Sequence, residues 1–339
     1  MIEPSPSDAP AGQPEAIAPP HVRYSGFWRR VGAACIDALI LGLIGVPITL
    51  LFADALVRMA TAGRAIGFLI AGGYFVIFNS RIGRGQTLGK RVTGIGVRDL
   101  NGDLIGPRQA IWRFIWFGTP YFLNGLFLPL GPDTNMFVAV ALGIVLVFIV
   151  FWGFTGNLYL LLCNRPSRRL LHDLFARTVV LRLPVTVQPV ARPTALVHRW
   201  MVACLPLVLL GGIALAGFIA ISNLVPRLSQ LTAMQARLAS LPGVVSAEVT
   251  HVVQSRAGKR LHVLRMILRV VRLPVSIAQR TATDQVIGVA LPGGQGREEF
   301  DAIQVIFIRG VDIGIASWSK SVSDMRMRDQ LPPASGAST

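Results

Sequence analysis

The segment Tyr24–Phe52, YSGFWRRVGAACIDALILGLIGVPITLLF, decides the class of fold. Residues 31–52 are an apolar run in which Asp37 is the only charged side chain. A helix needs about 20 apolar residues to cross the hydrocarbon core of a bilayer. Aromatic residues and two arginines come directly before the run, as expected where a helix enters the lipid headgroups. The segment therefore predicts a membrane-spanning helix.

Further apolar runs predict an all-α membrane bundle of five spanning helices. The third run is interrupted by Pro120, Asn124, Gly125 and Pro129, so it either spans the bilayer or re-enters it, packed against protein. The later runs are residues 65–79, 114–130, 136–163 and 201–225.

The composition agrees with a lipid environment. Of the 339 residues, 52% are hydrophobic and 15% are charged, whereas soluble domains carry about 25% charged residues. The formal net charge is +16, but the basic residues flank the apolar runs and form no stripe interleaved with aromatics. The charge therefore indicates the bilayer as a partner and not a nucleic acid. The cysteines, which lie in or beside apolar runs and are expected to act as small hydrophobic residues, are Cys35, Cys163 and Cys204.

The distribution of Lys and Arg predicts the orientation. Residues 1–30, 80–113 and 164–199 hold seventeen of them, whereas the intervening loops 53–64 and 131–135 hold two. Cytoplasmic loops carry the excess of basic residues in such proteins. We therefore expect a bacterial inner (plasma) membrane protein with a cytoplasmic N-terminus and a periplasmic or extracellular C-terminus.

These features divide the chain into segments. Residues 1–22, rich in Pro, Ala and Ser, predict a disordered cytoplasmic tail. Residues 23–199 predict the membrane domain, with cytoplasmic loops 80–113 and 164–199. The fifth helix, an external domain and a flexible tail are predicted at residues 200–225, 226–323 and 324–339.

The external domain predicts an α+β fold in the order αββαββ. Leucines at helical spacing end at Pro242-Gly243, and β-branched runs follow. We expect two helices on one face of an antiparallel sheet. The predicted strands are 244–253, 261–271, 302–308 and 313–318, and the second helix is 276–291.

Asp37 is the most informative single residue of the first helix. A carboxylate inside a spanning helix costs a few kcal/mol unless it is paired, protonated or hydrated. Arg30 lies seven residues earlier on the same face, and Arg113 is a rival partner at the next cytoplasmic interface. Two hypotheses follow: a structural ion pair that fixes helix packing, or a carboxylate that carries a proton or cation.

The loop Gly83–Arg91, GRGQTLGKR, resembles a phosphate-binding loop only superficially. The position five before Gly89 is Arg84 instead of glycine, and Lys90 is followed by Arg91 instead of Ser or Thr. Nucleotide hydrolysis is therefore not expected. Residues 93–99 and the Asn101-Gly102 turn after them predict a small cytoplasmic hairpin.

Three blocks of sequence together resemble the RDD family of bacterial membrane proteins, over residues 24–183. The family is named for one arginine and two aspartates, which match Arg30, Asp37 and Asp173. The resemblance implies a helical membrane domain, and some members of the family are linked to cation/proton exchange. The blocks are Gly26–Asp37, Gly85–Asp99 with the loop residues Gly85, Thr87, Gly89, Lys90 and Arg91, and Leu171–Val180.

Asp173 follows Arg168 and Arg169, which are expected to keep it ionised. We expect it to latch its segment against the Lys90-Arg91 loop, with a proton relay through His172 as the alternative.

Catalytic, cofactor and metal sites are not predicted. His251 and His262 are expected to lie nearly opposite across a hairpin, but zinc needs a third protein ligand and none is evident. The leading hypothesis is therefore a non-enzymatic membrane protein whose bundle anchors an external interaction domain. It would be an accessory subunit of an inner-membrane complex, with a membrane-protein partner or a homo-oligomer. The alternative is a secondary transporter that exchanges small cations for protons.

Overall fold

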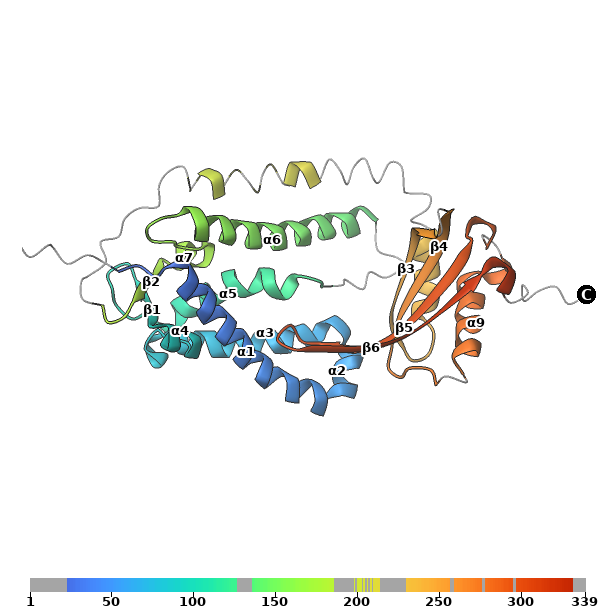
Figure 1. Ribbon diagram of the computed structural model, residues 1–339, viewed down its shortest axis with the longest axis horizontal. Coiled ribbons are helices and arrows are strands. Elements are labelled where there is room, and N and C mark those ends of the chain that lie inside the picture. The colour runs from blue at the N-terminus through green and yellow to red at the C-terminus, as the bar shows by residue number, and fades with distance from the viewer. Residues whose placement is uncertain are drawn as a thin grey trace, which may run out of the picture.

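Figure 1 shows a computed structural model of the chain, in which a helical bundle adjoins a smaller domain built on a sheet. The structure describes residues 23–126, 136–185, 230–256, 259–275, 278–294 and 297–331, together with helical residues at 198, 200–202, 204, 206, 208 and 210–213.

The bundle is built from long apolar helices, as predicted for a membrane protein. Among the described residues, three helical segments are long and apolar enough to cross a membrane: Phe27–Leu51, Ala53–Asn79 and Ala141–Cys163. The corresponding elements are α1 (Phe27–Leu51), α2 (Ala53–Met59), α3 (Gly63–Asn79) and α6 (Met136–Cys163).

The third apolar run forms a shorter helix. Helix α5 (Pro107–Leu123) begins before the run and continues through Pro120. Its 17 residues span about 25 Å, less than the roughly 30 Å of a hydrocarbon core. Gly153 of α6 accommodates the Pro120 ring, since a Cβ at Gly153 would lie 2.3 Å from Pro120 Cγ. The predicted tail 1–22 lies outside the described residues, as does most of the predicted fifth helix.

Short elements gather at one end of the bundle (Figure 1). Strand β1 (Ile95–Asp99) pairs antiparallel with β2 (Thr178–Arg182), and Tyr24 bridges to Leu181 at the edge of β2. The local hairpin predicted after Thr93 is therefore wrong, because β1 finds its partner far along the chain. The same end contains α4 (Leu88–Thr93) and α7 (Leu171–Phe175).

The C-terminal domain contains the first three predicted strands and a fourth that begins later than predicted, and its sheet is mixed. Its described strands lie in the order β3-β4-β5-β6, in which β4 and β5 are parallel and the other pairs antiparallel. Helix α9 forms the crossover that a parallel pair requires, so the expected antiparallel sheet is wrong. Residues 230–239 are helical and, with α9, pack Leu238 and Ile287 against the sheet core. The bounds are β3 (Val244–Arg256), β4 (Lys259–Val270), α9 (Gln279–Ala290), β5 (Ala302–Asp312) and β6 (Ser317–Met327).

The last hairpin differs from its prediction at its turn and at the end of its second strand. Residues 313–316, predicted to begin a strand, form the turn between β5 and β6. Strand β6 continues to Met327, beyond Ser323, where a loose tail was expected.

The β5–β6 hairpin reaches out of the sheet and ends inside the bundle (Figure 1). Ile313 packs with Leu56 and Val57 of α2, and Ile315 packs against the cluster that contains Phe122 of α5. A Cβ at Gly67 of α3 would lie 1.7 Å from the Ile313 carbonyl oxygen, so only glycine fits there. The two parts of the chain are therefore joined by an apolar contact.

Polar contacts surround this apolar contact. The Arg64 guanidinium donates to the Asp312 carboxylate at 2.6 Å, and Arg309 donates to Asp54 at 2.8 Å. The Tyr121 hydroxyl donates to the Gly314 carbonyl at 3.1 Å. These contacts hold the hairpin against the bundle. We call its tip, residues 313–316, the docked tip.

Candidate functional site

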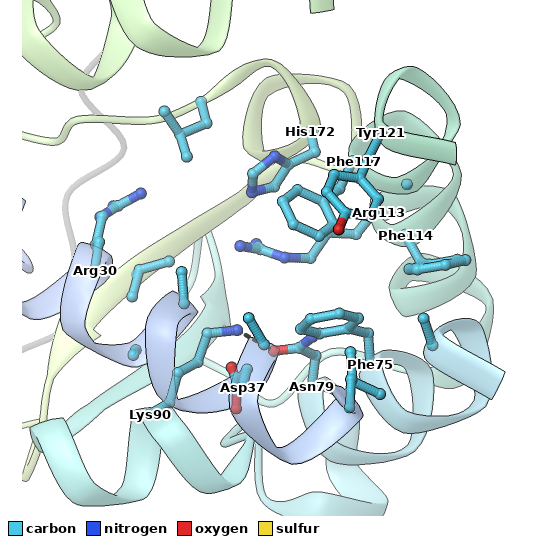
Figure 2. Close-up of a pocket in the computed structure, with 18 of the residues that line it drawn as sticks. Arg30, Asp37, Phe75, Asn79, Lys90, Arg113, Phe114, Phe117, Tyr121 and His172 are labelled. Carbon is cyan, nitrogen blue, oxygen red and sulfur yellow. Dashed lines mark hydrogen bonds between the residues drawn. The ribbon is translucent and has the colours of Figure 1, made fainter. Parts of the chain in front are cut away.

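A cavity of about 230 Å³ lies inside the bundle between α1, α3 and α5. Its polar end is lined by Arg30, Lys90, Arg113 and His172, and Ile315 of the docked tip also contributes to its wall. The rest is largely apolar and aromatic. Figure 2 shows the side chains of Lys90, Arg113 and His172 pointing into the same space from different elements. Aromatic residues of the wall are Phe75, Phe114, Phe117, Tyr121 and Phe122.

Asp173 organises the polar end. Its side chain is fully buried, and one oxygen accepts from Arg30 Nη1 at 3.0 Å while the other contacts Arg113. The Thr178 hydroxyl donates to it at 3.1 Å, and so does the Leu170 backbone amide. One carboxylate therefore joins α1, α5, α7 and the start of β2.

Asp37 is held by neutral donors instead of a charge. Its oxygens accept from the Tyr74 hydroxyl at 2.7 Å, the Thr87 hydroxyl at 2.6 Å and the Gly89 amide at 2.8 Å. The predicted pairing of Arg30 with Asp37 is wrong. Side chains on a helix tilt toward its N-terminus, which directs Arg30 away from Asp37 and toward Asp173.

The loop residues of the sequence block position α4 against α1. Thr87 is the N-cap of α4, because its hydroxyl oxygen accepts from the Lys90 amide at 3.3 Å. Gly89 meets α1 so closely that a Cβ would lie 2.2 Å from the Ala33 carbonyl oxygen. Gly85 has φ +71° and faces the Val97 carbonyl, so the left-handed backbone requires glycine there.

Lys90 and Arg91 point to different surroundings. The Lys90 ammonium donates to the Asn79 side chain and lines the cavity (Figure 2). Arg91 is exposed and lies over the Phe78 ring at 5.6 Å. The expected latch between Asp173 and these two residues is replaced by contacts of Asp173 with Arg30 and Arg113.

Burial and neighbouring charge shift several pKa values at this end. Desolvation, assisted by the positive charge of Arg113, lowers the pKa of Lys90 to about 7. Desolvation lowers the pKa of His172 to about 3, so its imidazole is neutral at physiological pH. Burial alone raises the pKa of Asp173, but the charges of Arg113 and Arg30 outweigh it and hold the pKa below its ordinary value. Asp173 is therefore ionised.

Several partners at the site are not evident from the sequence. Tyr74 and Asn79 lie in the apolar run 65–79, and Thr178 is part of a β-branched strand. Their spacing carries no signal, because they meet Asp37, Lys90 and Asp173 only in the folded chain. A polar residue on the buried face of an apolar helix is the one available indication.

Among the described residues, no group of three His, Cys, Asp or Glu side chains is placed to hold a metal ion. His251 and His262 contact each other at 3.1 Å across β3 and β4, in diagonal register because His262 pairs with Val253.

Comparison with known families identifies the membrane part of the chain. Residues 24–177 match the sequence model of the RDD family, which confirms the resemblance and ends six residues before the predicted limit at Leu183. No curated protein and no solved structure matched the chain.

Proposed function

We propose, from the match of residues 24–177 to the RDD family, that the chain is a non-enzymatic component of the bacterial inner membrane. In this proposal its bundle anchors the C-terminal α+β domain outside the cytoplasm and holds it in a fixed orientation. The oriented domain binds a membrane-protein partner, as an accessory subunit does.

The docked tip carries this proposal. A tethered domain would need only a linker, whereas here Ile313 is fully buried against the bundle and Asp312 pairs with Arg64 at 2.6 Å. Apolar burial with charged pairs at its edge is typical of an interface that fixes orientation. Such an arrangement supports a domain that must face a partner at a set height and angle.

The proposed topology rests on charge and on the two ends of the bundle. The short elements β1, β2, α4 and α7 share one end, and their loops are rich in Arg and Lys. The hairpin enters the bundle from the opposite end (Figure 1). The excess of basic residues in these loops favours a cytoplasmic location for the end that holds the short elements. Five crossings then place the C-terminus outside the cytoplasm.

Fusions and pull-downs test the proposal together. A C-terminal alkaline phosphatase fusion should be active and a C-terminal green fluorescent fusion dark; the reverse result would reject the topology.

Co-purifying membrane proteins should be retained by wild type and lost in Ile313→Asp, which buries an unpaired carboxylate at the docked tip. The matched control is Val253→Asp, at an exposed position of the same domain. Equal recovery from both variants would show that docking is not needed.

An exchanger of small cations for protons receives less support from the cavity. Its lining contains three basic side chains, and the Asp37 carboxylate already accepts three hydrogen bonds. Cation-dependent proton movement in vesicles that is lost in Asp37→Asn, with protein abundance unchanged, would reverse this ranking.

A further inference from the structure

The polar end of the cavity holds more positive than negative charge. Arg30, Lys90 and Arg113 line it, whereas Asp37 is the one carboxylate among the lining residues that the structure describes. Asp173 lies behind them and is shared between two guanidinium groups. Buried charges are stable when they are paired, and among the described residues three cations share two carboxylates at this end.

Hydrogen-bonding groups at the same place are also unsatisfied. Arg30 Nε and His172 Nδ1 are buried and have no hydrogen-bond partner among the described residues. The side chains of Arg30 and His172 are each 7% exposed. Buried polar atoms are nearly always hydrogen-bonded, so unpaired ones in a cavity indicate a missing ligand group. The Lys90 ammonium, with three N–H donors, has Asn79 as its side-chain acceptor and retains donors for a further group.

The remainder of the cavity is apolar. Along α1 it runs from Arg30 to Leu41, which corresponds to about 16 Å of helix. Phe75, Phe114 and Ile315 line the part away from the charges. The volume, about 230 Å³, is smaller than the roughly 300–1,000 Å³ of pockets for drug-sized ligands. It suits a small charged group with a short apolar continuation.

We propose that this cavity binds a small oxyanion, a phosphate or carboxylate group that is either free or at the end of an apolar chain, between Arg30, Lys90, Arg113 and His172. Guanidinium and ammonium groups bind phosphate and carboxylate oxygens through short, charge-assisted hydrogen bonds. A neutral His172 supplies one N–H donor to the same group. The site is independent of the role proposed for the external domain.

Titration calorimetry on the full-length protein in an uncharged detergent tests the site. The probes are inorganic phosphate, octyl phosphate and octyl glucoside, which separate a free anion, an anion on an apolar chain and an uncharged amphiphile. Saturable binding of octyl phosphate alone supports an amphiphile as the source, and equal binding of inorganic phosphate supports a free anion. Failure of both phosphates to bind more tightly than octyl glucoside overturns the proposal.

Variants locate the binding. Lys90→Gln removes one charged contact without breaking an ion pair that the structure shows, and it should weaken phosphate binding about tenfold. Arg30→Lys keeps a positive charge near Asp173 but lacks Nε, and it should weaken binding as well. The matched control is Arg108→Gln, an exposed arginine in the first turn of α5. Equal weakening by Arg108→Gln, or unchanged binding in a folded Lys90→Gln protein, would exclude the site.

Discussion

Arg30 and Asp173 lie 143 residues apart in the chain and form a buried ion pair, with 3.0 Å between Nη1 and Oδ2. Arg113 contacts the second oxygen of the same carboxylate. Because the pair joins α1 to the segment after α6, it closes one end of the bundle.

Loss of the Asp173 charge is expected to destabilise the protein strongly. Asp173→Asn leaves two buried guanidinium groups without their negative partner, and removal of one member of a buried pair costs about 3–5 kcal/mol. Thermal unfolding monitored by size-exclusion chromatography in detergent should show a large loss of folded protein. Asp103→Asn, at an exposed loop position, is the control and should behave as wild type.

Asp37 is expected to hold α4 in place. Asp37→Ala removes the acceptor for Tyr74, Thr87 and Gly89, so the loop should detach from α1. Limited trypsin digestion should then cleave after Lys90 or Arg91 faster than in wild type. An unchanged digestion pattern would mean that glycine packing alone holds α4.

Phosphate binding is expected to depend on pH through Lys90. Its pKa is lowered to about 7 by desolvation and by Arg113, with Arg30 also opposing the charge and Asp37 and Asp173 favouring it. A bound anion stabilises the ammonium and raises this pKa, so binding should be tightest below pH 7 and weaken as the pH rises above it. A phosphate probe ionises in the same range, with a second pKa of about 6. Calorimetry between pH 6 and about 9 should therefore compare wild type with Lys90→Gln, and the ratio of their affinities should fall as the pH rises. Asn79, the other group facing the ammonium, does not titrate.

The same shift predicts how stability varies with pH. The pKa of Lys90 is lower when folded than when unfolded, where it is about 10.4. Between these values the unfolded chain binds more protons, so this residue makes the folded state more stable as the pH rises from about 7 to about 10. Denaturant midpoints of wild type and Lys90→Gln, compared across this range, should converge at high pH.

Gly67 is expected to be essential for docking of the hairpin. Gly67→Ala places a Cβ 1.7 Å from the Ile313 carbonyl oxygen, whereas Gly73 of the same helix has open space around it. In a variant with the native cysteines replaced, maleimide should label a cysteine at Ala316 faster in Gly67→Ala than in wild type. Gly73→Ala should leave the labelling rate unchanged.

The sequence predicts α1, α3 and α6 closely because lipid imposes a long, uniform apolar pattern. Asp37 stands out because charge is rare in such segments, whereas Asp173 is singled out by the resemblance to the RDD family. The sequence does not predict their partners, since Arg30 and Asp173 meet only after α6 has returned the chain to the same end. The strand–helix–strand order of β4, α9 and β5 does carry a signal for a parallel pair.

The apolar tip of the last hairpin is the feature most easily misassigned. Ile313 and Ile315 are β-branched, as strand residues often are, but they lie in a turn. Their side chains are apolar because they face the bundle. The isolated C-terminal domain would expose this apolar tip to water. That domain should aggregate through this tip, and a double Ile313→Ser, Ile315→Ser change should restore solubility.

The position of Asp173 also sets an order of events during synthesis. Arg30 emerges from the ribosome 143 residues before its partner, an interval on the order of ten seconds at roughly 5–20 residues per second. Tyr121 emerges 193 residues before Gly314, the residue whose carbonyl it contacts, so this second contact forms only after Asp173 has been made. During translation the two ends of the bundle therefore close one after the other, and the insertion machinery must shield an unpaired arginine first and an open apolar groove later.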